Sequence, residues 1–296
     1  MDIETVLRSG GGCARRAELV RSGRDAAELT ALVATGRVER VGRGLYALPD
    51  ALGEVVAARR LSGAVTCVSL AAWAELPLLE PPKGAHVAVP GHRGTPRPGT
   101  VARGTVLHWD SSISARRTTT AAPLSRALVH TMQCLPFREC VAVIDAALNR
   151  RLVRIDDLRA ERPRAGRLAF DRVLRAVDGR AQSMPETFMR LAVQGTRLDV
   201  EPQVQIAGIG FVDLLVEGVL IVEVDGFAYH SGRREYREDR RRDRTAHLAG
   251  LPVLRFAFED AVHATAQCAR EIELMVRRVL RGGTRPIVQR LGVRSV

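Results

Sequence analysis

Several features are scarce in this sequence of 296 residues, and each scarcity excludes a class of protein. Lys83 is the sole lysine among the 45 basic residues, so all other basic side chains are arginines. The five cysteines are scattered without a Cys-x-x-Cys pair, which predicts neither a disulfide framework nor a zinc ribbon. No run approaches about 18 apolar residues, and the acidic N-terminus does not resemble a signal peptide. We therefore expect a cytoplasmic protein that does not interact with membranes.

The charge balance is strongly positive. The 45 basic residues outnumber 33 acidic ones, for a formal net charge of +12. A GC-rich coding sequence would explain why arginine replaces lysine, but it would not explain the net excess of positive charge. A hydrophobic content of 46% excludes wholesale disorder, and the length accommodates two or three domains. These values predict globular domains with a polyanionic partner.

The first 50 residues predict three short helices followed by a hairpin. A Gly10-Gly11-Gly12 break follows the first helix, Asp25 is expected to cap the third, and Gly36 is expected to end it. Residues 38–48 then alternate apolar and basic side chains around a Gly-Arg-Gly turn. This order predicts a winged helix-turn-helix domain at residues 1–50.

The segment resembles the N-terminal winged-helix domain of abortive-infection type IV antitoxins, in which a Gly-Arg-Gly-x-Tyr turn closes the wing. The resemblance implies that Arg40 and Arg43 lie on the wing and Arg37 at its base, where all three would contact DNA phosphates. Winged helices also serve as protein adaptors, so a structural or partner-docking role stays open. An antitoxin would in addition have a toxin partner.

Residues 51–165 carry no catalytic signature and predict an α+β scaffold or interaction domain. A strand is expected at residues 85–89 and helices at residues 123–135 and 138–149. The histidines of this region are too dispersed to predict a metal site, and we expect each to be a surface or a hydrogen-bonded side chain. They are His86, His92, His108 and His130.

Residues 180–296 predict an α/β sandwich on a small mixed sheet, which makes the chain α/β overall. The pattern is a helix from Pro185, three strands, a helix, a strand and a closing helix. The strands are expected at residues 204–206, 210–216, 219–224 and 252–256, and the later helices at residues 233–249 and 260–280. Glu217-Gly218 is the expected hairpin turn.

Two acids lie within the apolar strands of this hairpin. Asp213 follows Phe211-Val212, and Glu223 follows Ile221-Val222 on the partner strand. A buried carboxylate is unfavourable without a compensating cation, and the positions of both acids relative to the turn make them near neighbours. The pair therefore predicts a site for Mg²⁺ or Mn²⁺, ions that activate water for phosphodiester hydrolysis.

The Asp-x9-Glu-x-Asp spacing resembles the PD-(D/E)XK nuclease superfamily, and the residues from Glu223 to His230 are similar to a family related to very-short-patch-repair endonucleases. The resemblance implies a restriction-endonuclease-like fold, in which Asp213, Glu223 and the Val224 carbonyl bind the metal. It assigns supporting roles to Asp225 and Glu186 and proton transfer to His230. The superfamily lysine is replaced here by Asp225, so its role would pass to His230 or to an arginine.

The helix expected at residues 233–249 is rich in charge. Such helices are usually solvated and contain pairs of opposite charge one turn apart. Helical spacing alternatively turns Asp239 and Asp243 toward the sheet, where Asp243 or Asp239 would orient His230, and leaves the arginines outside. Those expected to follow a DNA backbone are Arg237, Arg241 and Arg244.

The combined prediction is a metal-dependent DNA endonuclease or nickase acting in defence, repair or mobile-element control. The alternative is a non-enzymatic, antitoxin-like regulator in which the nuclease fold is inactive. RNA as the substrate and a homodimeric assembly stay open.

Overall fold

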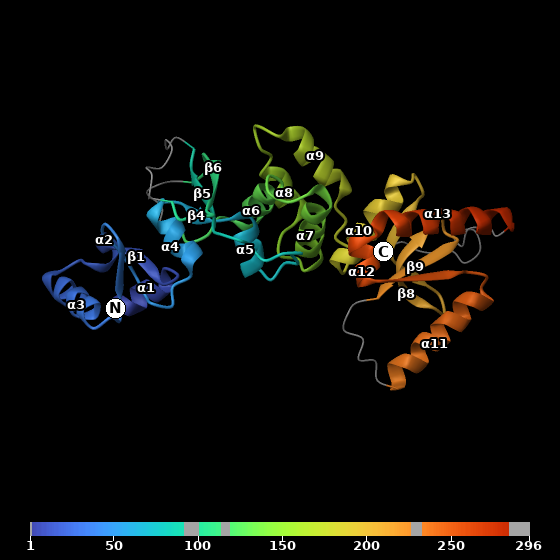
Figure 1. Ribbon diagram of the computed structural model, residues 1–296, viewed down its shortest axis with the longest axis horizontal. Coiled ribbons are helices and arrows are strands. Elements are labelled where there is room, and N and C mark those ends of the chain that lie inside the picture. Colours follow the sequence, from blue (N-terminus) through green and yellow to red (C-terminus); the bar gives the residue numbers. More distant parts are fainter. Residues whose placement is uncertain (1, 92–100, 114–118, 226–232, 284–296) are drawn as a thin grey trace. The chain divides into compact units, whose positions relative to one another are not determined.

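The computed structural model describes residues 2–91, 101–113, 119–225 and 233–283, which form an α/β chain (Figure 1). It divides into two compact units, of which unit 1 comprises Met1–Leu135 with Val153–Phe170. Unit 2 comprises Pro136–Leu152 with Asp171–Val296. The domain boundaries expected near residues 50, 165 and 180 stay predictions. Every helix of the described residues is too short or too polar to span a membrane.

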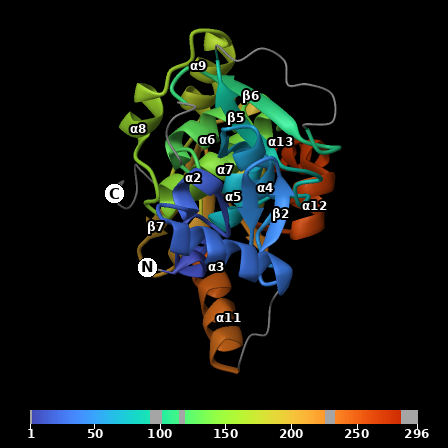
Figure 2. The same ribbon diagram turned by 90° about the vertical axis from the view of Figure 1, so that its left-hand side faces the viewer.

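Unit 1 begins with three helices and a three-stranded antiparallel sheet in the order β1-β3-β2. The elements are α1 (Ile3–Ser9), β1 (Cys13–Arg15), α2 (Arg16–Leu19), α3 (Gly23–Ala34), β2 (Glu39–Gly42) and β3 (Leu45–Ala47). Leu7, Leu29 and Leu32 pack in the common core of these helices, which face the viewer in Figure 2. The predicted order is confirmed, with β1 as an additional strand. Ser22, rather than Asp25, caps α3, because Asp25 occupies the third helical position of a capping box.

The rest of unit 1 contains a second three-stranded sheet in the order β4-β5-β6, with β5 and β6 parallel. Its elements are α4 (Gly53–Arg60), β4 (Ala64–Val65), α5 (Cys67–Trp73), β5 (His86–Pro90), β6 (Val106–Asp110), α6 (Leu124–Thr131) and α8 (Ile155–Ala160). Sequence patterning predicted β5 and α6 but not α4 or β6.

Unit 2 contains a four-stranded mixed sheet in the order β10-β9-β8-β7. The strands are β7 (Val200–Ile206), β8 (Gly210–Val216), β9 (Leu220–Asp225) and β10 (Val253–Ala257). The helices are α7 (Phe137–Asn149), α10 (Met184–Gly195), α11 (Arg233–Leu248), α12 (Phe258–His263) and α13 (Thr265–Arg281), while α9 (Arg167–Ala176) crosses the boundary between the units. β7, β8 and β9 are successively antiparallel, and β10 joins β9 in parallel after α11.

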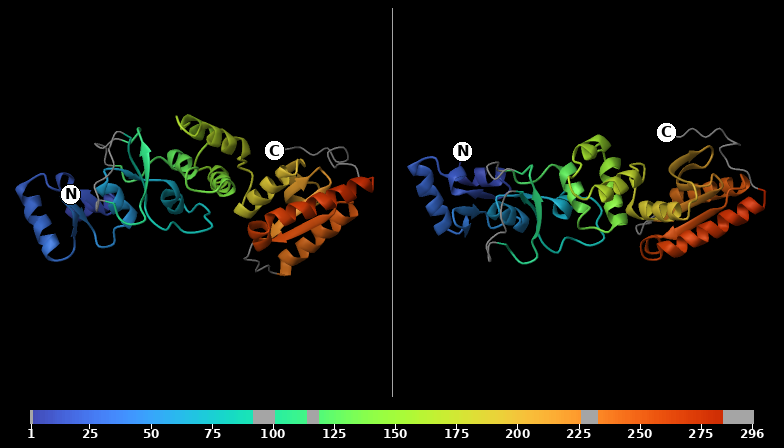
Figure 3. Two further views of the ribbon diagram at one scale, coloured as in Figure 1. Left: turned by 45° about the horizontal axis from the view of Figure 1, so that its top comes forward. Right: turned by 90° about the horizontal axis from the view of Figure 1, so that it is seen from above.

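Both faces of this sheet are covered by helices. Leu214 and Val222 point to the face on which α10, α12 and α13 pack, whereas Val212 and Ile221 point to the face on which Ala246 of α11 packs. Buried side chains alternate between the two layers along β9, whereas Val212 and Leu214 of β8 lie in different layers although they are only two residues apart. Figure 1 shows α11 and α13 on opposite sides of the sheet, and Figure 3 shows α13 in red along it. The predicted α/β class with a mixed sheet is confirmed.

Strand β7 lies at an edge of this sheet and departs from regular geometry in its middle. Pro202 has no backbone N–H, and Gln203 has a φ of 54°, which non-glycine residues rarely adopt. Pairing with β8 continues on both sides, at Pro202 opposite Leu214 and at Val204 opposite Val212. The backbone of Gln203 is therefore turned locally while the register of the strand is kept.

Candidate functional site

Carboxylates from three elements of unit 2 meet where β8 and β9 stop pairing. The last described pair of that ladder is Leu214 opposite Val222, and one further step in the same register would bring Asp213 opposite Glu223. Instead, the Asp213 carboxylate accepts a hydrogen bond of 2.9 Å from the Val224 N–H. The expected proximity of Asp213 and Glu223 is thus realised at the end of the ladder.

Glu186 joins this group from the first turn of α10. Ser183 caps the helix, and the Glu186 carboxylate accepts hydrogen bonds from the Gln182 N–H at 3.0 Å and the Gln203 side chain at 2.9 Å. The same Gln203 nitrogen lies 3.4 Å from Asp213 Oδ1. The turned backbone of Gln203 therefore places an amide between two carboxylates, a link that sequence analysis missed.

Glu223 is held by two arginines, one on each side. Its Oε1 is 3.0 Å from Arg242 Nη2 of α11, and its Oε2 is 2.9 Å from Arg255 Nη1 of β10. Arg255 also lies 3.6 Å from Asp225 and 2.7 Å from Asp243. Both arginines were missed, because an arginine in so arginine-rich a chain carries no signal of its own.

Burial and crowding raise the pKa of three of these carboxyl groups. Desolvation is the main cause of the raised pKa of Glu186, Asp213 and Glu223, while hydrogen bonds or the arginines act in the opposite direction. Asp213 further raises the pKa of Glu186 and Glu223, and Asp225 raises that of Asp213. With Asp225 and Asp243 there are five carboxylates against two guanidinium groups, so the site carries excess negative charge.

The Val224 carbonyl lies on the same side of β9 as Asp213. In an extended strand the N–H and C=O of one residue point in the same direction, and the Val224 N–H points to Asp213. Carboxylate and carbonyl oxygens are the ligands that Mg²⁺ prefers, so the donor chemistry fits this ion. Both Glu223 oxygens are paired with arginines, however, so binding an ion would require at least one of these pairs to open.

The part of α11 that follows its first turn contacts the sheet through both acids and arginines. Asp243 turns toward the sheet, as predicted, and lies beside Arg255 of β10. Arg242 also faces the sheet, where it donates hydrogen bonds to the carbonyls of Ile209 and Phe211. Arg242 thereby corrects the expectation that the arginines of this helix all lie outside. His230 and its expected contact with Asp243 lie outside the described residues.

The three arginines of α11 expected to meet DNA have different surroundings. Arg237 and Arg244 are exposed, whereas Arg241 pairs with Glu238 and donates to the Gly208 carbonyl. None of these contacts tests their predicted role.

The basic hairpin of unit 1, β2 and β3 with the turn between them, carries two of the three predicted arginines at exposed positions. Arg40 lies on β2 and Arg43 in the turn beside Gly44, whose φ of 63° suits glycine. Arg37, before β2, is also exposed but pairs with Glu4 of α1 at 2.7 Å. Arg40 and Arg43 are therefore more accessible to an anionic partner than Arg37.

Sequence analysis also missed a group of metal-ligand type in unit 1. Cys67, His86, His108 and Cys134 bring one ligand atom each within 4.8 Å of one another. Within the described residues the acids of unit 2 do not form a comparable group of three or more. His86 and His108 are hydrogen-bonded, as expected, but the pairing of β5 with β6 brings them into one group with the two cysteines, which their dispersal in the sequence did not predict.

Comparison with known proteins characterises the N-terminal segment. Residues 1–49 match the family described as "Transcriptional regulator, AbiEi antitoxin", which confirms the antitoxin resemblance for α1 to β3. No curated protein matches the chain.

Proposed function

We propose that the chain binds duplex DNA through residues 1–49 and hydrolyses phosphodiester bonds at the carboxylate site of unit 2 with Mg²⁺ or Mn²⁺. The convergence of Glu186, Asp213 and Glu223 at the open end of the β8–β9 ladder carries the hydrolytic half of this proposal. The family match of residues 1–49 supports the DNA-binding half. The fields of action remain defence, repair and mobile-element control.

The residues divide into ligands and positioning groups. Asp213, Glu223 and the Val224 carbonyl would hold the ion, which when bound activates water and neutralises charge on the phosphodiester. Glu186 has one oxygen engaged by two donors, so it acts by fixing Gln203 against Asp213. Gln203 in turn keeps Asp213 oriented toward β9.

Arg255 takes over the electrostatic part of the missing lysine's role. It sits on β10 opposite Glu223 and contacts three carboxylates. A guanidinium stays protonated near neutral pH, so Arg255 supplies positive charge but transfers no proton. His230 stays the candidate for proton transfer, and Asp225 acts beside Arg255.

A second candidate function is a non-enzymatic, antitoxin-like DNA-binding regulator with a toxin partner. The double pairing of Glu223 with Arg242 and Arg255 favours it, because a carboxylate satisfied by two cations has less need of a metal. In this case unit 2 would be structural, and DNA binding would persist without hydrolysis.

Incubation of the purified full-length chain with supercoiled plasmid separates the two functions. We expect nicking with Mg²⁺ or Mn²⁺ and none with EDTA, while the Asp213→Asn variant, purified in parallel, leaves the plasmid supercoiled. A single-stranded RNA substrate tests the RNA alternative. Absence of cleavage with either ion, alongside intact duplex binding, would leave the regulator as the function. Equal cleavage by both proteins would reveal a contaminant and remove the site assignment.

The Arg255→Met variant tests the positioning role. Loss of the cation leaves Glu223, Asp225 and Asp243 repelling one another and frees a Glu223 oxygen for the ion, so we expect about 10–100-fold slower nicking with a lower Mg²⁺ requirement. Arg255→Lys should recover part of the rate, since the charge returns but a single ammonium nitrogen replaces the two nitrogens that contact Glu223 and Asp243. An Mg²⁺ requirement equal to that of the wild type would contradict this role.

The Arg40→Ala/Arg43→Ala variant tests the basic hairpin. We expect weaker duplex binding, and the salt dependence of log K should be smaller by about 1 for each phosphate that an arginine no longer neutralises. Fluorescence anisotropy with a labelled duplex at several salt concentrations measures both. Arg159→Ala, which removes an exposed arginine of α8, is the matched control and should leave both unchanged. An unchanged slope in the double variant would assign DNA contact elsewhere.

A further inference from the structure

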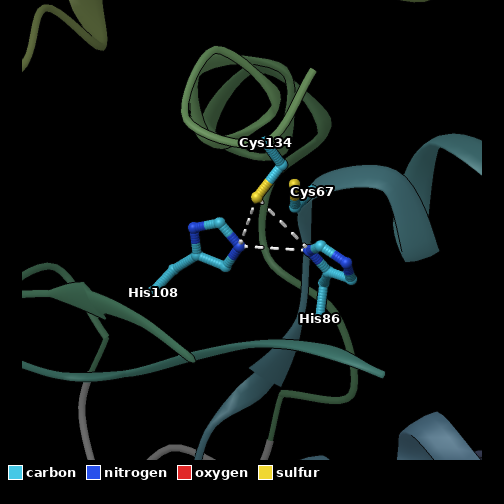
Figure 4. A group of neighbouring side chains, drawn as sticks. All are labelled: Cys67, His86, His108 and Cys134. Atoms are coloured by element: carbon cyan, nitrogen blue, oxygen red, sulfur yellow. Dashed lines mark hydrogen bonds between the residues drawn. The ribbon is translucent and has the colours of Figure 1, made fainter. Parts of the chain in front are cut away.

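Four potential metal ligands of unit 1 converge from four separate places in the fold (Figure 4). Cys67 begins α5, His86 begins β5, His108 lies in β6 and Cys134 follows α6. His86 and His108 share one face of the parallel pair, because His108 is opposite Ala88, two residues from His86. The strands thus present two imidazoles side by side, and two helix ends bring the thiols over them.

The distances between ligand atoms agree with the edges of a tetrahedron around Zn²⁺. His86 Nδ1 lies 3.3 Å from His108 Nε2, and Cys134 Sγ lies 3.7 Å from the first and 3.8 Å from the second. Zinc bonded at its usual lengths to nitrogen and sulfur would separate two nitrogens by about 3.3 Å and nitrogen from sulfur by about 3.6 Å. Cys67 contributes the fourth ligand atom, within 4.8 Å of the others.

The surroundings hold these side chains in place. His108 Nδ1 lies 3.3 Å from Gln133 Oε1, and this contact turns the opposite ring nitrogen, Nε2, toward the cluster. Histidines that bind metals are commonly oriented in this way, by a hydrogen bond at the ring nitrogen that does not bind the metal. The backbone on both sides of His86 is fixed, since its N–H donates to Ser69 Oγ and its C=O accepts from Thr66. Cys67 has a φ of 55°, a strained conformation for a residue with a side chain. Strain kept at one ligand points to a use for the cluster.

The ligand set and its spacing decide which metal fits. Two thiols and two imidazoles in tetrahedral arrangement select zinc, and four protein ligands close the coordination shell. A [2Fe–2S] cluster with the same ligand types would place two irons between the histidines and the cysteines. The sulfur-to-nitrogen distances of 3.7 and 3.8 Å leave room for one ion only.

We propose that Cys67, His86, His108 and Cys134 bind one structural Zn²⁺ ion in unit 1. The ion ties the start of α5 and the segment after α6 to the β5–β6 pair, so it joins four segments spread over residues 67 to 134. This site shares no residue with the carboxylate site and does not depend on the proposed function.

Metal analysis of the full-length chain tests the proposal. Protein expressed with zinc and purified without chelators should contain one Zn²⁺ per chain, as measured by inductively coupled plasma mass spectrometry. Cobalt substituted for zinc should show the visible absorption of a tetrahedral site together with thiolate charge transfer in the near ultraviolet. Chelation should lower the unfolding temperature of unit 1, which the fluorescence of Trp73 and Trp109 reports, and added zinc should restore that temperature.

Variants identify the ligands. Cys134→Ser and His108→Ala should lose the metal, whereas His247→Ala, an exposed histidine of α11, should keep it. The cobalt spectrum of the wild-type chain tests the ligand set even where a variant fails to fold. Folded wild-type protein that takes up neither zinc nor cobalt, or that contains a Cys67–Cys134 disulfide after purification under reducing conditions, would overturn the proposal.

Discussion

Replacing Arg190 by methionine is expected to lower the free energy of unfolding of unit 2 by about 3–5 kcal/mol. Arg190 of α10 and Asp145 of α7 form an ion pair of 2.8 Å, and their side chains are only 2% and 1% exposed. Thr187 and the Asp178 N–H also donate to Asp145. Without Arg190 a buried carboxylate keeps its neutral donors but loses its only counter-charge among the contacts described.

The effect of this substitution should depend on pH. Burial raises the pKa of Asp145 to about 6 even though Arg190 and the donors lower it, so loss of Arg190 should raise it further. Only the variant takes up a proton between its raised pKa and about 6, so the destabilisation should shrink as the pH falls through this window. Below about 6 Asp145 is protonated in both folded proteins, and the difference should stay constant.

Urea unfolding at pH 7 and pH 5.5 measures the loss. Trp73 and Trp109 both lie in unit 1, so circular dichroism combined with tryptophan fluorescence separates the transition of unit 2. Arg277→Ala, which breaks an exposed pair with Glu273 in the same unit, should cost less than about 1 kcal/mol. An Asp145→Asn/Arg190→Met variant should recover stability relative to the single variant. A single variant as stable as the wild type would show that the pair is dispensable.

The Asp213→Asn variant should lose at least about 10³-fold in nicking rate and yet gain stability at neutral pH. Under the proposed function, Asp213 holds the metal, whose stabilisation of the transition state is worth several kcal/mol. The folded protein without metal, by contrast, gains from removal of a crowded, buried charge. The Val224 N–H keeps an acceptor, because the asparagine carbonyl takes the place of the carboxylate oxygen.

The sign of the pH dependence follows from the raised pKa of Asp213. Between its ordinary value of 3.8 and the raised value the folded state binds more protons than the unfolded state, so stability falls as pH rises through this window. The asparagine variant lacks this loss, so its advantage over the wild type should grow as the pH rises through this window and stay constant above it. Thermal unfolding in EDTA from below pH 3.8 up to pH 7 measures it. A variant that is less stable than the wild type at pH 7 would contradict the crowding of charge described for this site.

The fold of unit 2 could be predicted largely from local patterns. Apolar runs of strand length and the residues Glu217 and Gly218, both with positive φ, define the hairpin, and β8 spans the predicted residues. The closing helix was expected to be continuous, but it is broken between His263 and Thr265 into α12 and α13. Periodicity alone does not reveal such a break, because both helices keep apolar side chains toward the sheet.

The carboxylate site could be predicted only in part. Acids are conspicuous within apolar strands, which is why Asp213 and Glu223 stood out. Arg242, Arg255 and Gln203 did not, since their importance arises from the pairing of β10 with β9 and from the unusual backbone of one residue. Local spacing says nothing about either.

The cysteine and histidine cluster could not be predicted from spacing at all. Its four members are spread over residues 67 to 134, far beyond the short intervals of zinc ribbons. The parallel pairing of β5 with β6 brings the two histidines together, and β6 itself was not anticipated. A site assembled by tertiary contacts becomes visible only once the sheet is known.

The irregular middle of β7 has a further consequence, for association between molecules. β7 pairs only with β8 among the described strands, so its outer edge offers backbone groups to which a strand of another chain could add. Pro202 withdraws one donor from the strand, and the positive φ of Gln203 interrupts its extended path. A second strand would find no continuous row of partners there. The residue that links two carboxylates inside unit 2 therefore also protects this edge against aggregation by strand addition.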